Sequence, residues 1–157
     1  MSNIATTIEQ SKHLLELGLD PKTADMHYVR KVTDFMGNRI ENPKWSVSKY
    51  GSPNSKHASY IVQNFTDFEI LPAWSLSALL EVMPNNDYWE ICLWQYKDQR
   101  WQCVFDDVEF SNGETKSFVA DTPIDAAYEM VCWLLENNLI KKGGNDENET
   151  NVHSNAD

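Results

Sequence analysis

The stretch 88–120 constrains the fold more than any other part of the chain. It contains three runs rich in aromatic and β-branched residues, 88–96, 100–110 and 115–120, and such residues favour strands. Asn112-Gly113 separates the last two runs and is a strong hairpin signal, because both central residues of a type I′ turn need positive φ. We therefore expect three consecutive antiparallel strands that form a β-meander.

The first hairpin of this meander determines which side chains share a face of the sheet. A tight turn at Asp98-Gln99 places residues whose numbers add up to 197 opposite each other, so that Trp94 faces Cys103. One face then carries Tyr88, Cys92, Trp94, Tyr96, Trp101, Cys103 and Phe105, and the other carries Trp89, Ile91, Leu93, Val104 and Val108. Both faces are apolar, so either helices cover both or one aromatic face is kept for a partner.

Three segments show the apolar periodicity of amphipathic helices: 4–17, 75–84 and 122–139. Each has a serine or threonine near its start that can cap a helix. Gly18 is placed to end the first helix, and Thr122-Pro123 combines a cap with the residue type preferred at the first helical position. The sequence therefore predicts a helix near each end of the folded chain and one between them.

The segment between the first and second expected helices is less regular. Strands are expected near 26–32, 45–50 and 59–63, and a long loop runs through 33–56, which glycine and proline interrupt. The mixture of strands and helices predicts an α+β fold, in which an antiparallel β-meander sheet of three to five strands is packed by two or three helices.

The last residues differ in composition from the rest of the chain. Residues 143–157 hold four acids, no bases and one large apolar residue, so they cannot bury enough apolar surface to offset the entropy of ordering. We therefore expect a single α+β domain over 1–142, followed by a disordered acidic tail over 143–157.

Common cofactor and metal sites cannot be assembled from this composition. The six glycines fit neither a GxGxxG motif nor a phosphate-binding loop. The four histidines show no HExxH or paired spacing, and the three cysteines contain no CxxC motif. We therefore expect no cofactor and no metal ion, and cysteines that act as small apolar core residues.

The chain carries no recognisable targeting or membrane segment. No apolar run approaches the roughly 20 residues that cross a bilayer, and the first ten residues lack the basic start and apolar block of a secretory signal. We therefore expect a soluble protein of the cytoplasm with no membrane partner.

One pattern is typical of an enzyme. Asp107, Glu114 and Lys116 resemble the acid and E-x-K arrangement with which metal-dependent nucleases hold Mg²⁺ and a phosphate. With a turn at Asn112-Gly113, opposed residues add up to 225, and Glu114 lies about 13 Å along the sheet from Asp107. Two carboxylates that far apart cannot share one cation, and the same register pairs Lys116 with Glu109. We therefore expect no catalytic residue here and no enzymatic activity.

Charge is unevenly distributed along the sequence. Residues 22–56 carry seven bases and three acids, whereas residues 57–140 carry three bases and 14 acids. In the first segment, basic residues are interleaved with aromatic ones, the mixture that grips single-stranded nucleic acid. The residues concerned are Tyr28, Arg30, Lys31, Lys44, Trp45 and Lys49. The net charge of −11 repels a polyanion, so nucleic acid is disfavoured, and the acidic half suits a basic protein partner.

Three stretches of sequence also carry a resemblance to other proteins: LLELGLDPKTADM (14–26), PAWSLSALLEVMP (72–84) and TPIDAAYEMVCWLLEN (122–137). They resemble small uncharacterised proteins of bacteriophages, prophages and mobile elements of gut anaerobic bacteria. The matching motifs are helix caps and helix faces, so the resemblance assigns no catalytic or binding residue. It implies expression inside a bacterium as an accessory gene product.

The sequence as a whole predicts a non-enzymatic accessory protein that acts by binding another macromolecule. The expected partner is a protein or a second copy of the chain. Candidate binding residues, besides the basic and aromatic set above, are the tryptophans that flank loops, Trp45 and Trp74, and two of the aromatic face, Trp94 and Trp101. The alternatives are a module that binds single-stranded nucleic acid through 28–50 and a metal-dependent nuclease.

Overall fold

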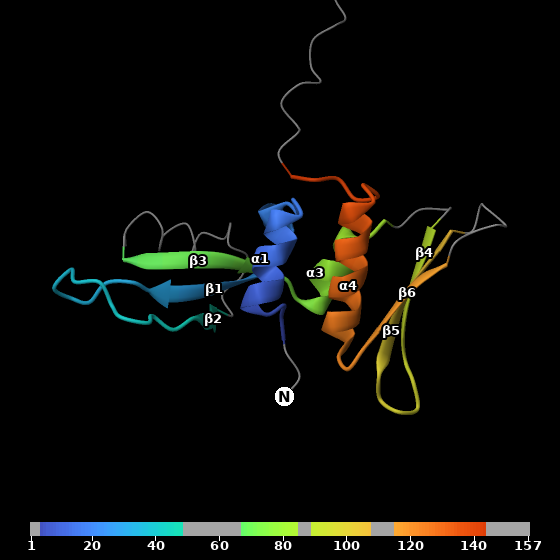
Figure 1. Ribbon diagram of the computed structural model, residues 1–157, viewed down its shortest axis with the longest axis horizontal. Helices are drawn as coiled ribbons and strands as arrows, with labels where there is room; N and C mark the ends of the chain where they lie inside the picture. The colour runs from blue at the N-terminus through green and yellow to red at the C-terminus, as the bar shows by residue number, and fades with distance from the viewer. Residues whose placement is uncertain (1–3, 49–66, 85–88, 108–114, 144–157) are drawn as a thin grey trace, which may run out of the picture.

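The computed structural model describes residues 4–48, 67–84, 89–107 and 115–143 (Figure 1). Within these ranges the chain forms three α-helices and two three-stranded antiparallel sheets. The molecule is elongated, with the first sheet at one end, the helices in the middle and the second sheet at the other end (Figure 1). The predicted α+β class is confirmed.

Helix α1 (Ile8–Glu16) begins at Thr7, the second of two adjacent threonines that could cap it. The Thr7 hydroxyl accepts a hydrogen bond from the backbone N–H of Gln10, and the Gln10 side chain accepts one from the backbone N–H of Thr7. These two bonds form a capping box, so the helix begins later than the predicted residue 4. Gly18 follows the helix with a φ of +94°, a conformation that favours glycine.

The first sheet has the order β2-β1-β3, formed by β1 (Met26–Lys31), β2 (Ser46–Ser48) and β3 (Phe68–Ala73). Strand β3, which contains Pro72, was not predicted from the sequence; its place at the edge of the sheet tolerates a residue without a backbone N–H. The strand expected at 59–63 lies outside the described residues.

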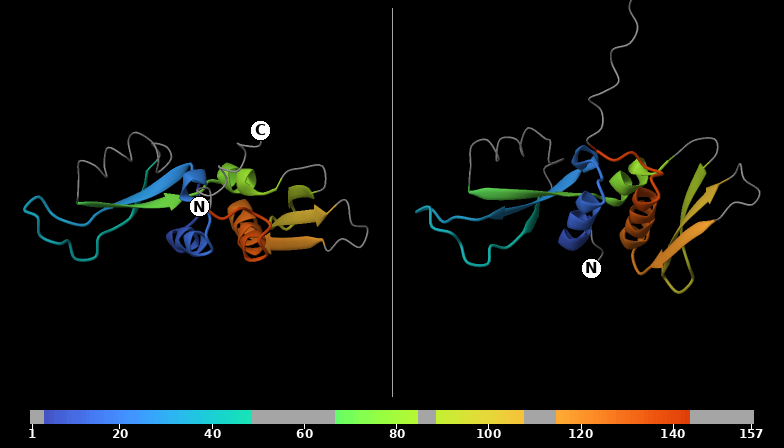
Figure 2. Two further views of the ribbon diagram at one scale, coloured as in Figure 1. Left: turned by 90° about the horizontal axis from the view of Figure 1, so that it is seen from above. Right: turned by 45° about the horizontal axis from the view of Figure 1, so that its top comes forward.

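Residues 32–45, here called the arm, project from the first sheet and join β1 to β2 (Figure 2). The sequence predicted an irregular loop here, but the two sides of the arm are held together. Thr33 and Arg39 form an antiparallel bridge, and the backbone N–H of Ile40 donates to the carbonyl of Val32 at 2.8 Å. The arm is therefore a backbone-paired hairpin that continues from β1 and is not an irregular loop.

The second sheet is the predicted meander, with β4 (Trp89–Gln95), β5 (Trp101–Asp107) and β6 (Lys116–Ala120) in the order β4-β5-β6. The expected turn at Asn112-Gly113 lies outside the described residues, as does all of the expected tail over 143–157 except Gly143, whose backbone N–H donates to the carbonyl of Gly18 at 3.0 Å. The strands of the first sheet do not join the meander, so six strands form two sheets in place of one.

The predicted register of β4 and β5 is wrong by one residue: opposed residues add up to 196, and Trp94 lies opposite Gln102. The loop has three residues, because the backbone N–H of Tyr96 donates to the carbonyl of Arg100 and Gln99 adopts a φ of +69°. The shift moves side chains between faces. The face toward the helices, here called the inner face, carries Ile91, Leu93, Trp101, Cys103, Phe105, Phe118 and Ala120.

Two more helices complete the fold. Helix α3 (Leu76–Val82) begins at Ser75 and α4 (Pro123–Glu136) begins at Thr122, as predicted. In each case the cap hydroxyl accepts a backbone N–H of the first turn. Helix α4 ends before the predicted residue 139, because Asn138 adopts a φ of +56°.

The core lies around α4, which covers the inner face of the second sheet and packs on its other side against α3 and α1 (Figure 2). Its fully buried side chains come from all these elements and include Leu14, Trp74, Leu79, Cys103, Met130, Val131, Leu134 and Leu135. No helix among the described residues is long and apolar enough to cross a membrane.

The cap of α4 provides a test of the fold. Thr122→Ala should lower the free energy of unfolding by about 1 kcal/mol, because the backbone N–H of Asp125 loses its acceptor. Thr122→Ser keeps the hydroxyl and should leave stability close to that of the wild type. Urea unfolding followed by circular dichroism measures both, and equal losses in the two variants would contradict the role of the cap.

Candidate binding surface

The face of the second sheet that points away from α4, here called the outer face, is apolar at its centre. Its strand residues are Glu90, Cys92, Trp94, Gln102, Val104, Asp106, Ser117 and Val119. No described segment crosses this face (Figures 1 and 2). Trp94 is 50% exposed and Val119 44%, and Tyr96 at the end of the face is also exposed. Large apolar side chains that are half exposed on a flat sheet are typical of an interaction surface.

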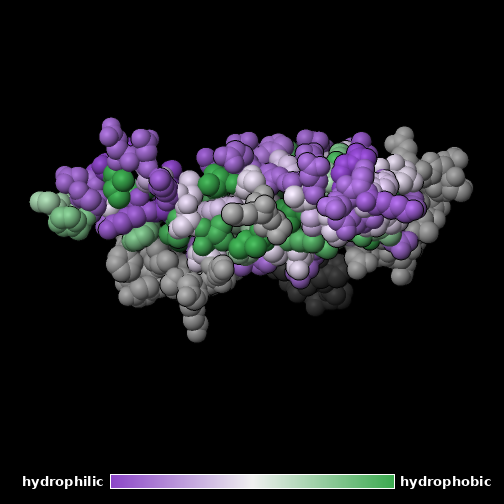
Figure 3. Space-filling model, turned by 90° about the horizontal axis from the view of Figure 1, so that it is seen from below, coloured by the Kyte–Doolittle hydropathy of each residue, from purple (hydrophilic) through white to green (hydrophobic). Residues whose placement is uncertain are grey.

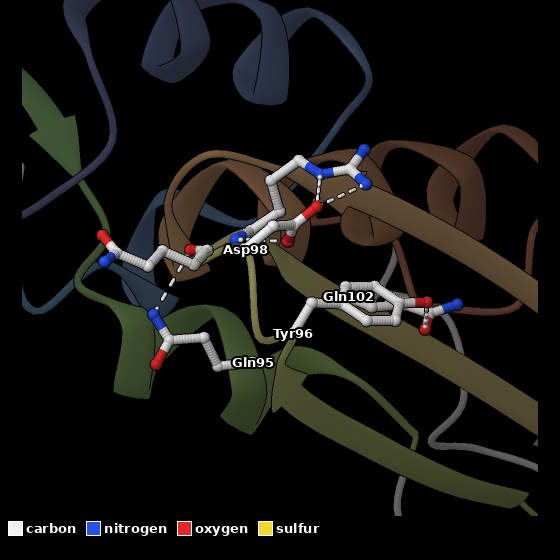
Figure 4. Close-up of polar contacts among 6 residues, drawn as sticks. Gln95, Tyr96, Asp98 and Gln102 are labelled. Carbon is white, nitrogen blue, oxygen red and sulfur yellow. Dashed lines mark hydrogen bonds and ion pairs between the residues drawn. The ribbon is translucent and has the colours of Figure 1, made fainter.

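Gln102 holds the two aromatic side chains of the outer face in place. Its amide oxygen accepts a hydrogen bond from the indole Nε1 of Trp94 at 2.8 Å and another from the Tyr96 hydroxyl, shown as a dashed line in Figure 4. Because these contacts already limit the rotamers of both rings, binding to them loses less conformational entropy.

The turn that joins β4 to β5 is also held by side-chain hydrogen bonds. The Arg100 guanidinium donates to the Asp98 carboxylate at 2.9 Å, and the Gln95 amide donates to the Gln99 carbonyl at 3.2 Å (Figure 4). The hydrogen bonds from Arg100 lower the pKa of Asp98. The aromatic end of the outer face therefore sits on a well-defined hairpin.

The opposite end of the outer face is acidic. Glu90 lies directly opposite Asp106, and both side chains are exposed. Like charges in directly opposed positions destabilise a sheet. Cys92 lies between Glu90 and Trp94 in β4, and burial together with the neighbouring Glu90 raises the pKa of its thiol. The outer-face strand residues include no Lys or Arg, so this end favours a positively charged partner.

The four candidate tryptophans occupy different environments. Trp94 is on the outer face, whereas Trp101 is on the inner face and packs against the core. Trp74 is fully buried, and its indole N–H donates to the Thr23 hydroxyl at 2.9 Å. Trp74 and Trp101 are therefore core residues and do not line an exposed groove. The sequence prediction was wrong for them because a position next to a cap or a turn does not show which way a side chain points.

The basic and aromatic residues of the first sheet do not form one continuous surface. Arg30 donates to Glu69 at 2.7 Å and lies over the Trp45 ring, with its Cζ 4.4 Å from the centroid. The Tyr28 hydroxyl donates to the backbone carbonyl of Thr6 at 2.7 Å. One face of the indole ring and the Arg30 charge are thus already engaged within the protein.

The remaining members of this set are scattered. Lys31 and Lys44 are exposed, but Lys31 follows Arg30 in the strand and points to the opposite face of the sheet. Lys49 lies outside the described residues. Strand β3 brings Glu69 beside Arg30, and Asp67, just before β3, lies next to Val32 at the end of β1, so the segregated positive charge seen along the sequence is offset in space.

The register of β5 and β6 removes the geometric argument against a metal-dependent nuclease. Opposed residues of β5 and β6 add up to 221, and Lys116 lies opposite Phe105, so its predicted pairing with Glu109 is wrong. The separation of about 13 Å between the two carboxylates followed from that register and no longer holds. Lys116 instead lies over the Phe118 ring, with Nζ 5.2 Å from the centroid. Glu114 lies outside the described residues.

A cysteine and a histidine meet at the interface of α1 and α4. The Sγ of Cys132 lies 3.8 Å from Nδ1 of His13, which is hydrogen-bonded to the Tyr128 hydroxyl at 2.6 Å. Burial raises the pKa of the Cys132 thiol to about 11. Burial therefore disfavours the thiolate form that a nucleophilic cysteine needs. Among the described residues, no group of three or more His, Cys, Asp and Glu could hold a metal ion.

Sequence reasoning missed two features of these surfaces. Gln102 and Val119 were not candidates, because only the true registers of the two strand pairs place them in one row with Trp94 across the outer face. Phe35 and Met36, at the end of the arm, are 92% and 73% exposed. Two large apolar residues before a glycine in a polar loop were the available signal.

Comparisons with known proteins add no family assignment. No protein-family model matches the chain, and no curated protein and no solved structure matches it. Any function must therefore be inferred from the geometry of the molecule itself.

Two tryptophans should differ sharply in their effect on stability. Trp74→Ala should lower the free energy of unfolding by about 3–5 kcal/mol, because it leaves a cavity in the core. Trp94→Ala removes a half-exposed ring and one hydrogen bond, so the loss should be about 1 kcal/mol or less. Chemical denaturation checks both, and a large loss for Trp94→Ala would show that its role is structural.

The cysteines should be poorly reactive in the folded protein. Burial raises the pKa of Cys103 to about 12 and that of Cys132 to about 11, so only about one Cys132 thiol in a thousand is ionised at pH 8. Alkylation by iodoacetamide at pH 8, followed by peptide mass spectrometry, should modify both residues much more slowly than in the denatured protein. Equal rates for Cys132 in the two states would revive it as a nucleophile.

Proposed function

We propose that the protein acts without catalysis, by binding another protein through the outer face of the second sheet. The observation that carries this proposal is Trp94, a half-exposed indole that Gln102 holds beside Tyr96 on the face that also exposes Val119. Tryptophan and tyrosine are enriched among the residues that dominate binding energy at protein interfaces.

The charge of the outer face indicates the chemistry of the partner. The apolar centre suits an apolar surface, and the opposed carboxylates of Glu90 and Asp106 suit Lys or Arg side chains at its border. A base placed between these carboxylates would relieve their repulsion as well as form new ion pairs. The partner is thus a protein with an apolar patch that basic residues border on one side.

Nucleic acid is a weaker candidate for the bound macromolecule. The residues expected to hold it include Arg30 and Trp45, which engage each other, and Tyr28, which hydrogen-bonds the backbone. An accessory role inside a bacterial cell, which the resemblance of three sequence stretches implies, fits binding to a protein of the same cell.

Site-specific crosslinking tests the proposed face. A photoreactive amino acid at Ser117, exposed on the outer face, should capture a partner in cells that naturally express the protein. Val119→Lys in the same chain should reduce the captured product at least about tenfold, because a charge enters the apolar centre. Ser77→Lys, an exposed change on α3, is the matched control and should leave it unchanged.

A second probe position distinguishes specific from random capture. The same photoreactive residue at Glu129, exposed on α4, should not yield the product. Identical products from both positions, or a product that survives Val119→Lys, would contradict the proposed use of the outer face.

A further inference from the structure

The end of the arm presents two apolar side chains to solvent. Phe35 and Met36, here called the tip, are the most exposed large apolar residues among those described, at 92% and 73%. Figure 3 shows the corresponding apolar patch at the far end of the arm, surrounded by hydrophilic residues. Neither side chain contributes to the core, so the fold does not explain why apolar residues occupy these positions.

The tip is held in a defined conformation. The Asp34 carboxylate accepts hydrogen bonds from the backbone N–H groups of Met36 at 2.8 Å and Asn38 at 2.9 Å. Hydrogen bonds from Asn38 lower the pKa of Asp34, so the carboxylate stays charged at neutral pH. Gly37 supplies a φ of +81° that closes the turn. A preorganised tip loses little entropy when it docks.

The distribution of charge favours the arm, among the parts of this chain, as the segment that binds the outer face. The described residues of the first sheet and the arm, 26–48 and 67–73, carry four bases and four acids, whereas all other described residues carry seven bases and 13 acids. Lys31 and Arg39 lie close to the tip in the chain and are exposed. The arm is therefore the part of this acidic protein that an acidic surface repels least.

The tip and the outer face have complementary side chains, and their positions allow contact only between two copies. Phenylalanine stacks on aromatic rings, and methionine makes favourable contacts with them, as Phe35 and Met36 could with Trp94 and Tyr96. The positive charge of Arg39 complements the negative charges of Glu90 and Asp106. The two surfaces lie at opposite ends of the molecule, so one copy cannot satisfy itself (Figures 1 and 2).

We propose that the Phe35–Met36 tip of one copy docks on the outer face of the second sheet of another copy. This inference rests on the proposed use of that face and names its partner as the chain itself. The contact joins two different surfaces, so it leaves a free tip at one end and a free face at the other and allows growth beyond a dimer. A contact of this small size is weak, with a dissociation constant between about 1 μM and 1 mM.

Sedimentation equilibrium of the full chain from about 10 μM to about 1 mM tests the proposal. The wild type should form species that grow with concentration and pass the size of a dimer. A tip variant, Phe35→Asp with Met36→Asp, and a face variant, Val119→Lys, should each weaken association at least about tenfold. Ile4→Asp, at an exposed apolar residue elsewhere, is the matched control and should associate as the wild type does.

Mixing the two variants gives the decisive result. The tip variant keeps an intact face and the face variant keeps an intact tip, so an equimolar mixture should form a one-to-one dimer that grows no further. Circular dichroism of each variant verifies that it is folded.

Other outcomes overturn the proposal. These are a wild type that stays monomeric throughout, association that only the face variant abolishes, as in a symmetric dimer of two faces, and binding of the tip to anionic lipid vesicles without self-association. Crosslinking from Ser117 to a different protein would in each case leave the proposed function standing, so the two failures are distinguishable.

Discussion

The structure depends on the burial of α4 from two sides. One side of the helix covers the inner face of the second sheet, and the other packs against α3 and α1, so Met130, Val131, Leu134 and Leu135 are fully buried. A polar contact fixes the position of α1 on this helix: the Gln10 amide donates to the Asp125 carboxylate at 2.7 Å, and Asp125 also accepts the hydroxyl of Thr122. Two helix starts are thus joined by one carboxylate.

This arrangement explains why the outer face is exposed. The described helices all lie on the inner side of the second sheet, and α4 alone provides most of its cover (Figure 1). Val104 of the central strand is buried, but Trp94 and Val119 on the flanking strands are not. The exposed rings of the outer face therefore follow from the placement of the helices, and the amide of Gln102 between them gives the surface its polar anchor.

Local signals in the sequence located the elements well, whereas long-range pairing was beyond them. Ser75 and Thr122 cap helices because their hydroxyls bond to residues only three positions away, which the sequence shows directly. The register of the first hairpin depended on Gln99 adopting a positive φ, which is uncommon for a residue with a side chain. That single residue decided that Gln102, and not Cys103, stands beside Trp94. The pairing of β3 with β1 joins segments that are about 40 residues apart, so no local pattern could reveal that Glu69 offsets Arg30.

The elongated arrangement also implies that stability is graded along the molecule. Fully buried apolar side chains gather around α4, while β1 and β2 contain mostly half-buried or exposed residues, and the arm extends beyond them. Backbone amides in regions with few buried apolar contacts open at a lower free energy than those of the core. We therefore expect protection against hydrogen exchange to be greatest in α4 and β5 and to decline toward Asp34, with the arm opening at a lower free energy than the helical core.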